Sequence, residues 1–568
     1  MTYNGFYDDN LEFVNLENIQ IVGSMNPSNT LGRHKLSTRF TSIVRLCSIN
    51  YPTNDQLQLI YGNYLQAILQ QQLPNHKIWS STSKTNQLAL SMIHVYDELR
   101  TKFNQDEHSH YLFTPRDLTR WCLSFLRYDL SGIKGDSNAD SLLEIWTYEA
   151  CRLFKDRLVG NDARDKFDQL LDKTLRSDWS SSALSALRDS YFVSWVNANN
   201  RRTLPPAGRL LSRLTTKDLT PFIDRGITRY RSDYRDTDVF LFREIIDAIV
   251  RCDRVLTSPG GSLLLAGRSG VGRRTAVGIV ASMNNMKLYS PKVSRSYGIK
   301  QFKNDLKTIL QNAGVEGEQC VLLMEDYQFI EPTFVELINS LLSAGEIPGL
   351  YSPDELEAIL SPLREDSSQE NFRGTMVQYF AQRVKTNLHI VLIMDFTRPT
   401  FTTACQSNPG FFKECAVQWT EGWSERSLVK IPSMLFSKDH SDEKGLAEKF
   451  TFDDELAKLF TYIYHSMDTK YHTPRRYLSL LETYRQVYVT KQTAIIKRQK
   501  HLKSGVSKLN DARKVVDDLR RNAEYKQKEL AIKQQEADDA LKQITKSMAV
   551  SIDPKCQSKQ TFEENRFF

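Results

Sequence analysis

A glycine-rich turn between an apolar run and a helical segment constrains the fold of this chain more than any other feature. The run GSLLLAG (261–267) leads into RSGVGRRT (268–275), and apolar residues with helical spacing follow. The pattern is close to GxxxxGK(S/T), whose backbone N–H groups close around phosphates at a helix N-terminus. The candidate phosphate-binding residues are Gly267, Gly270, Gly272, Arg273, Arg274 and Thr275.

Two arginines depart from that motif. In the standard loop a lysine reaches the terminal phosphates and the next hydroxyl binds Mg²⁺. Here Arg273 takes the lysine place, Arg274 takes the hydroxyl place, and Thr275 comes one position late. Arginine can neutralise phosphate but cannot ligate a metal. The alternative is a strand-to-helix turn without a ligand, and the position between strand and helix favours the phosphate loop.

Two further apolar runs, CVLLM (320–324) and LHIVLIM (388–394), are separated by helical segments. Such runs suit central strands of a parallel sheet covered on both faces, so an α/β fold is predicted. CVLLM ends in Glu325 and Asp326, a pair that would suit one Mg²⁺-ordering acid and one water-orienting base. The usual order is Asp then Glu, so we expect this catalytic pair to be impaired. Without the phosphate loop, two solvated acids would be the simpler interpretation.

Residues 491–548 follow a seven-residue repeat. One column of apolar or Ala residues continues over eight repeats: Ile495, Leu502, Leu509, Val516, Ala523, Leu530, Ala537 and Ile544. This predicts a long coiled-coil helix. The second column is irregular, which indicates pairing that is weak or ambiguous in register. The tail after Ala549 breaks the repeat and is predicted to be unstructured.

The formal net charge of +7 lies entirely in this repeat, which holds 15 Lys+Arg and 8 Asp+Glu. The basic character is therefore predicted to be a solvated helix face, and nucleic acid is not an expected partner. The eight cysteines form no CxxC pair, so neither a zinc ribbon nor a redox motif is predicted, and a reduced, intracellular chain is expected. No apolar run approaches the length of a membrane span.

The N-terminal part is expected to begin inside a larger domain. ENIQIVGSMNP (17–27) has the pattern of a buried strand, and no earlier strands exist to pair with it. From about 54 to 200, apolar residues recur at three- and four-residue spacing, which predicts helices. Residues 198–216 have the Pro and Gly content of a connector.

In their order along the chain, these parts resemble a dynein heavy chain, an AAA+ motor. VGSMNPSNTLGRHKLSTRF (22–40) resembles the end of the third AAA+ module, and FTPRDLTRW (113–121) resembles its small-subdomain motif. FVELINSLLSAGEIPGLY (334–351) and TPRRYLSLLETY (473–484) resemble later parts of the fourth module. The altered phosphate loop is most similar to the class of these motors that drives retrograde intraflagellar transport.

The resemblance implies an AAA+ module with a parallel sheet, flanking helices and helical small subdomains, followed by a coiled-coil helix. The expected order is the end of the third module's large subdomain (1–55), its helical small subdomain (56–200), a connector (201–240), the fourth module's large α/β subdomain (241–430), its helical small subdomain (431–490), the outgoing stalk helix (491–548) and a disordered tail (549–568).

Roles for single residues also follow from the resemblance. Asn26 matches the sensor-I amide of the third module, and Arg39 matches its arginine finger, which would reach the second module's nucleotide. Arg116 and Arg475, each in a TPR triplet, match sensor-II arginines.

Two positions of the fourth module depart from the family. Asp395 lies where a sensor-I amide would be, and Glu414 lies where the finger arginine would be. A carboxylate near a triphosphate repels it. We therefore expect the fourth module to bind ATP or ADP, with Mg²⁺ possible, and to hydrolyse it slowly or not at all.

The resemblance implies part of a microtubule motor that contributes a ring segment and half a stalk. Implied partners are the rest of the heavy chain, the microtubule through the stalk tip, and intermediate and light chains through the tail. The implied locations are the cytoplasm, the cytoskeleton and the cilium or axoneme. Whether this segment is itself an enzyme stays open. The alternatives are a non-motor AAA+ scaffold or assembly protein and a nucleic-acid-associated P-loop ATPase, which would need a basic patch on the α/β domain.

Overall fold

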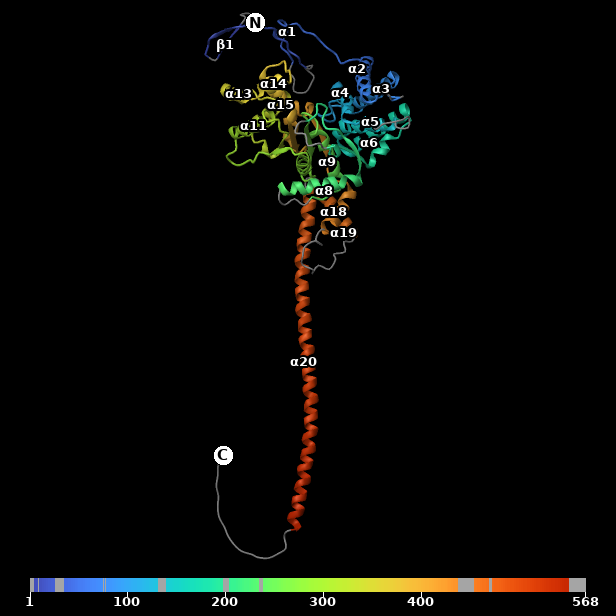
Figure 1. The fold of residues 1–568 in the computed structure, drawn as a ribbon, viewed down its shortest axis with the longest axis vertical. Coiled ribbons are helices and arrows are strands. Elements are labelled where there is room, and N and C mark those ends of the chain that lie inside the picture. The colour runs from blue at the N-terminus through green and yellow to red at the C-terminus, as the bar shows by residue number, and fades with distance from the viewer. Residues whose placement is uncertain are drawn as a thin grey trace. The chain divides into compact units, whose positions relative to one another are not determined.

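The computed structural model describes residues 5–8, 10–25, 35–74, 76, 78–130, 139–197, 204–233, 239–437, 454–468 and 472–550. The chain divides into two compact units, Met1–Ser479 and Leu480–Phe568. The first contains a helical region, blue to teal in Figure 1, and an α/β region, green to yellow. No helix among these residues combines the length and apolar character needed to cross a membrane.

The helical prediction for residues 54–200 is confirmed. Five helices of ten residues or more lie there: α2 (Asn54–Gln72), α3 (Thr82–Lys102), α4 (Pro115–Ser124), α5 (Ala139–Leu153) and α6 (Gly160–Trp179). Shorter elements are η1 (Phe125–Arg127), η4 (Lys155–Arg157), α7 (Ala183–Ala186), η5 (Leu187–Asp189) and η6 (Trp195–Asn197). Their core is built on Trp79, Trp121, Trp146 and Phe154, which are fully buried.

The range 201–240, expected as a connector, contains regular structure. Strand β4 (Ser212–Thr215) pairs antiparallel with β3 (Ser190–Val193), and helix α8 (Thr216–Asp233) follows. Helix α8 forms because Leu219, Ile223 and Ile227 lie four residues apart, and all three are buried.

The strand predicted at 17–27 is wrong over its described part. Residues 17–25 form neither strand nor helix, and Ile21 and Val22 are 66% and 86% exposed. The nearby strands β1 (Gly5–Tyr7) and β2 (Phe13–Asn15) pair with each other. Among the described residues, no strand pairs with this segment, and a lone strand is not stable. The short helix α1 (Thr38–Thr41) follows.

The predicted α/β fold is confirmed by a five-stranded parallel sheet in the order β6-β7-β8-β5-β9. The strands are β5 (Ser262–Gly267), β6 (Lys287–Tyr289), β7 (Cys320–Glu325), β8 (Leu388–Met394) and β9 (Cys415–Thr420). β5 and β8 are buried along their whole length, as expected for central strands covered on both faces.

Helices cover both faces of this sheet. Helix α10 (Arg273–Met283) packs against α8 and α9 (Arg243–Leu256) on one side. On the other side, α11 (Ile299–Gly314), α12 (Pro332–Ala344) and α15 (Met376–Asn387) share a core with β7 and β8. The shorter elements here are η7 (Asp326–Gln328), α13 (Pro353–Leu360), α14 (Leu363–Gln369), α16 (Pro399–Ser407) and α17 (Gly410–Lys413).

The chain continues through α18 (Glu425–Ser437) and α19 (Asp454–Ser466) into α20 (Pro474–Val550), a helix of 77 residues. The predicted long helix is confirmed, and it begins at residue 474 instead of 491 because neither Gly nor Pro interrupts residues 475–504. The large apolar residues of the heptad column are exposed, from 55% for Ile544 to 71% for Leu509. Residues 551–568 of the expected tail lie outside the described residues.

Candidate nucleotide site

The glycine-rich turn joins β5 to α10 at the carboxyl edge of the sheet. Gly270 and Gly272 have φ of +92° and +91°, a region that favours glycine. Space gives a second reason, because a Cβ on Gly270 would lie 2.4 Å from the backbone nitrogen of Arg475, and one on Gly272 would lie 2.4 Å from Cδ1 of Ile245. The turn is therefore held between α9 and the first turn of α20.

A pocket of about 290 Å³ opens over this turn. Its polar wall contains five of the six predicted loop residues, together with Glu325; only Gly267 is not in the wall. Apolar side chains also line it: Val239, Phe240, Phe242, Ile245, Val271, Ile393, Trp423, Ile431 and Leu478. The rings of Phe242 and Trp423 meet edge to face, 5.0 Å apart. A pocket lined by a glycine-rich loop and by apolar side chains suits a ligand that carries both a planar base and phosphates.

Arg273 turns beneath the loop instead of reaching over it. Its Nη1 donates to the carbonyl oxygens of Leu265 at 2.7 Å and Met394 at 2.8 Å, and its Nη2 donates to Arg268 at 3.1 Å. Burial lowers the pKa of Arg273 to about 10. The side chain in the lysine place thus donates to carbonyl groups at the ends of β5 and β8 and in the loop, which uses three of its five N–H donors.

Arg274 pairs with the first acid of the predicted catalytic pair. Its Nη1 lies 2.8 Å from Oε1 of Glu325, so an ion pair links the first turn of α10 to the end of β7. The Arg274 side chain is 53% exposed and the Glu325 side chain is 21% exposed. The residue in the hydroxyl place and the residue in the metal-ordering place therefore contact each other directly.

The second acid and the sensor-like acid are engaged by the backbone. Asp326 accepts a hydrogen bond from the N–H of Asp395 at 2.5 Å, and burial raises the pKa of Asp326. Asp395 accepts from the N–H and hydroxyl of Thr397, at 3.0 and 2.7 Å. Its carboxylate is thus turned into its own loop. The D-x-T spacing is a known turn signal that sequence analysis did not use.

The sensor-like Arg475 reaches this site through its backbone. The N-terminal turn of α20 packs on Gly270, and the Arg475 side chain is exposed. Nearby, Nη1 of Arg268 donates to the carbonyl of His472 at 3.2 Å. The start of α20 is therefore tied to the phosphate loop by two separate contacts.

Two other predicted residues meet away from this pocket. Nη1 of Arg116 lies 3.7 Å from Oε1 of Glu414. Beside them, Nη2 of Arg120 donates to the carbonyl of Lys413 at 2.7 Å. The structure thus brings together two residues for which the sequence predicted a sensor-II position and a finger position. Arg39 is exposed on α1, and Asn26 lies outside the described residues.

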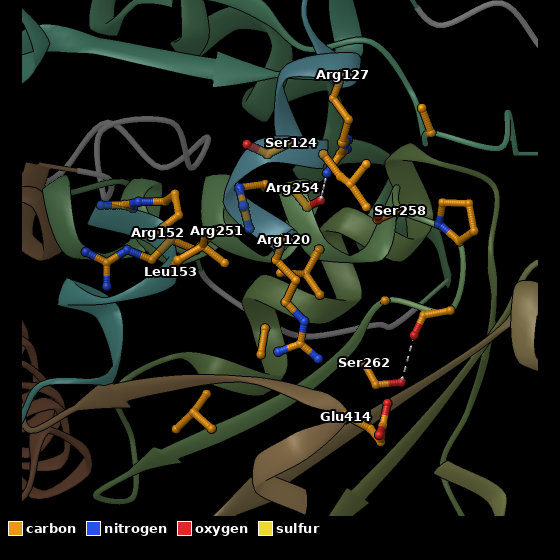
Figure 2. A pocket seen from close by; sticks show the side chains of 18 of the residues that line it. Arg120, Ser124, Arg127, Arg152, Leu153, Arg251, Arg254, Ser258, Ser262 and Glu414 are labelled. Carbon is orange, nitrogen blue, oxygen red and sulfur yellow. Dashed lines mark hydrogen bonds between the residues drawn. The ribbon is translucent and has the colours of Figure 1, made fainter. Parts of the chain in front are cut away.

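A second, larger cavity lies between the helical region and the α/β region. It has a volume of about 730 Å³, and Figure 2 shows arginines gathered along it, with Ser262 and Glu414 on the side of the sheet. The lining cations are Arg120, Arg127, Arg152, Arg157, Arg251, Arg254 and Lys385. No sequence signal points to this cavity, because its arginines come from separate segments and share no motif.

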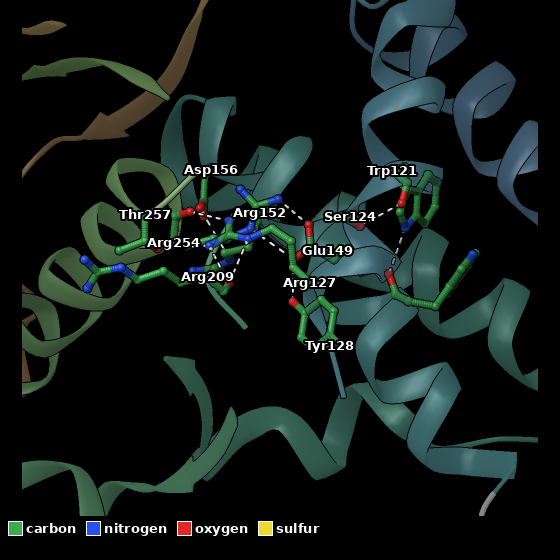
Figure 3. A network of polar contacts seen from close by, with 11 residues as sticks. Trp121, Ser124, Arg127, Tyr128, Glu149, Arg152, Asp156, Arg209, Arg254 and Thr257 are labelled. Carbon is green, nitrogen blue, oxygen red and sulfur yellow. Dashed lines mark hydrogen bonds and ion pairs between the residues drawn. The ribbon is translucent and has the colours of Figure 1, made fainter. Parts of the chain in front are cut away.

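Most of these arginines already have protein partners, as Figure 3 shows for the deepest of them. Nε of Arg254 donates to Glu149 at 3.0 Å, and the second carboxylate oxygen contacts Nη2. Tyr128 also donates to Glu149, which is 1% exposed. Arg127 donates to Thr257 at 2.9 Å and to the carbonyl of Arg254. This network joins the helical region to α9.

Comparison with known proteins agrees with this architecture. Residues 64–164 match the family described as dynein heavy chain, ATPase lid domain. Residues 237–487 match the P-loop containing dynein motor region D4. The second match contains every residue that lines the pocket over the glycine-rich turn, and it contains the start of α20.

Individual relatives match almost the entire chain. Cytoplasmic dynein 2 heavy chain 1 of Tripneustes gratilla is 52% identical over 92% of this chain and 12% of its own length. The human protein of that name is 49% identical over 98% of this chain and 13% of its own, and the Chlamydomonas reinhardtii protein is 36% identical over 97% and 12%. The chain thus spans about an eighth of the length of these relatives, and it belongs to the dynein heavy chain family.

Proposed function

We propose that this chain is a segment of a microtubule motor heavy chain that works in retrograde intraflagellar transport. The observation that carries the proposal is the similarity to cytoplasmic dynein 2 heavy chain 1 over 98% of the chain. The segment contributes part of the AAA+ ring and one stalk helix, α20. The motor binds the microtubule through the stalk tip, and intermediate and light chains join through the tail. It acts in the cytoplasm and cilium, on the cytoskeleton.

The test uses the full heavy chain that contains this segment, in ciliated cells. Depletion of that heavy chain should stop the retrograde movement of fluorescent transport particles while anterograde movement continues at first. Re-expression of the heavy chain should restore retrograde movement. Unchanged retrograde velocity after complete depletion would overturn the proposal.

Within the segment, the pocket over the glycine-rich turn binds ATP or ADP and hydrolyses it slowly or not at all. Binding is supported by the loop with two left-handed glycines and by the apolar side chains that line the same pocket. Slow hydrolysis is supported by the engagement of both acids, Glu325 with Arg274 and Asp326 with the backbone of Asp395. Each acid therefore has one carboxylate oxygen held in a protein contact, which restrains it from the metal-ordering and water-orienting positions.

Nucleotide in this pocket acts as a regulatory element because the pocket includes the start of α20. Leu478 lines the wall, and the backbone of Arg475 rests on Gly270. Occupancy therefore braces the first turn of the helix that continues as the stalk.

Two measurements on the purified chain test this proposal. Nucleotide released by denaturation should be found at close to one molecule per chain, and turnover of added ATP should be near background. Turnover that is lost in both Glu325→Gln and Asp326→Asn would show that the pair is catalytic and would overturn the second half of the proposal. Less than a tenth of a molecule bound at saturating nucleotide would overturn the first half.

A further inference from the structure

The residues at the phosphate loop do not fit a magnesium ion. Mg²⁺ needs oxygen ligands at about 2.0–2.1 Å in near-octahedral geometry. The hydroxyl place holds Arg274, which has no lone pair to offer, and its guanidinium lies 2.8 Å from the Glu325 oxygen that would face the ion. The Arg274 guanidinium thus takes the place beside Glu325 in which a magnesium ion would bind in the standard loop.

The other side-chain oxygens near the loop do not replace the missing hydroxyl ligand. Oδ2 of Asp326 accepts the N–H of Asp395, and Oδ1 of Asp395 accepts from Thr397, so both carboxylates are oriented by protein contacts. Thr275 lines the pocket, but one residue further along a helix is about 100° further round its axis. Its hydroxyl therefore projects from a different face of α10 than the residue in the hydroxyl place does.

The pocket still carries the positive charge that phosphates require. The helix N-terminus at Arg273 and the backbone N–H groups of the loop favour an anion. The buried Arg273 guanidinium adds its charge from beneath, with its printed hydrogen bonds directed to backbone carbonyls of the protein. Arg274 is half exposed within the pocket wall and has five N–H donors, so it can contact Glu325 and a phosphate together.

We propose that this pocket binds its nucleotide without a divalent cation, and that Arg274 supplies at the phosphates the charge that Mg²⁺ supplies in the standard loop. The inference rests on the proposed nucleotide binding and adds the ionic form of the ligand. The species bound is the free nucleoside di- or triphosphate. Excess Mg²⁺ then competes with the pocket for free nucleotide instead of assisting binding.

The test is titration of the 568-residue chain with a fluorescent ADP analogue, once in excess Mg²⁺ and once in excess EDTA. An affinity in EDTA that is equal to that in Mg²⁺ within threefold, or tighter, supports the inference. An affinity more than threefold weaker in EDTA overturns it and leaves nucleotide binding in place. Absence of binding in both buffers instead overturns the proposed function, so the two failures are distinguishable.

Variants at one position sharpen the test. Arg274→Ser restores the standard hydroxyl and removes the guanidinium, so EDTA should now weaken binding at least tenfold. Arg274→Lys keeps a cation and should bind equally in both buffers. The matched control is Arg373→Ser, an exposed arginine between α14 and α15, which should behave as the wild type does. Equal binding of the Arg274→Ser protein in both buffers would show that Arg274 does not replace the ion. If that variant does not fold, the wild-type comparison decides alone.

Discussion

Two arginine–carboxylate pairs in this molecule have the same chemistry and different surroundings. The side chains of Arg254 and Glu149 are 12% and 1% exposed, whereas those of Arg274 and Glu325 are 53% and 21% exposed. Water cannot replace a lost partner in the first pair, so that pair holds two parts of the fold together. Water or a phosphate can replace a partner in the second, so that pair is available for exchange with a ligand.

The largest effect is expected from breaking the buried pair. Glu149→Ala leaves Arg254 charged and buried without its partner, which costs about 3–5 kcal/mol. Urea unfolding followed by tryptophan fluorescence reports on this region, because Trp121 and Trp146 lie in its core. The control is Glu98→Ala, whose ion pair with Lys102 lies along one helix with side chains 33% and 46% exposed.

The double variant Glu149→Leu with Arg254→Met should cost less than Glu149→Ala alone, since neither apolar side chain needs a partner. A loss below 1 kcal/mol for Glu149→Ala would mean that other contacts hold the helical region to α9.

A smaller effect is expected at the loop itself. Gly270→Ala places a Cβ at a φ of +92° and against the backbone of Arg475, which costs about 1–3 kcal/mol. Hydrogen exchange should rise at residues 268–275 and at the start of α20, and nucleotide affinity should fall. Gly505→Ala is the control, because that glycine lies inside α20 with open space around it and alanine there should stabilise the helix by about 0.5–1 kcal/mol. Unchanged exchange in the Gly270→Ala protein would contradict the close packing.

The exposed pair should contribute least to stability. A double-mutant cycle with Arg274→Ala and Glu325→Ala is expected to give a coupling below about 1 kcal/mol. Thermal unfolding of the four proteins measures it. A coupling above 2 kcal/mol would remove the contrast between the two pairs.

The smallest effect is a dependence on pH, with opposite signs at two carboxylates. Burial alone would raise the pKa of Glu149, and the Arg254 guanidinium outweighs it, so the pKa is lowered. Its contribution to stability is therefore present above its unfolded pKa of about 4.3 and is lost as pH falls through the folded value. Burial raises the pKa of Asp326, so its contribution is present below about 3.9 and is lost as pH rises through the folded value.

Asp326→Asn should therefore be slightly more stable than the wild type at pH 7, and the difference should vanish below about pH 4. Denaturant unfolding at both pH values measures it. The same gain at both pH values would mean that ionisation of Asp326 is not its source.

The central strands were predictable from sequence because β7 and β8 are continuous apolar runs. β6 has three residues and β9 includes the polar Gln418, so neither has that signal. The strand expected at 17–27 shows the converse, since an apolar run does not form a strand without an edge to pair with. Helix α8 went unpredicted although its apolar residues are spaced for a helix, because Pro and Gly upstream suggested a connector.

The sequence was enough to predict which residues belong to the candidate site. It was not enough to predict where their side chains point or which partners they contact. The loop and the acid pair are contiguous motifs, so their residues were found. Arg273 and Arg274 are adjacent and chemically identical, yet one turns under the loop and the other pairs with Glu325. Only the fold decides which is which. Glu149 and Arg254 lie 105 residues apart, and no local pattern relates them.

The heptad column of α20 presents an apolar or Ala side chain every seven residues. At 1.5 Å per residue, successive positions of the column lie about 10 Å apart along the helix, and each position resembles the next. Such a repeat is equivalent under a shift of one whole heptad, so the repeat alone does not define a register. The register has to be defined from one end of the helix, and its N-terminal end is the turn at Arg475, which packs on Gly270. The position of each heptad along α20 is therefore counted from the residues of that turn.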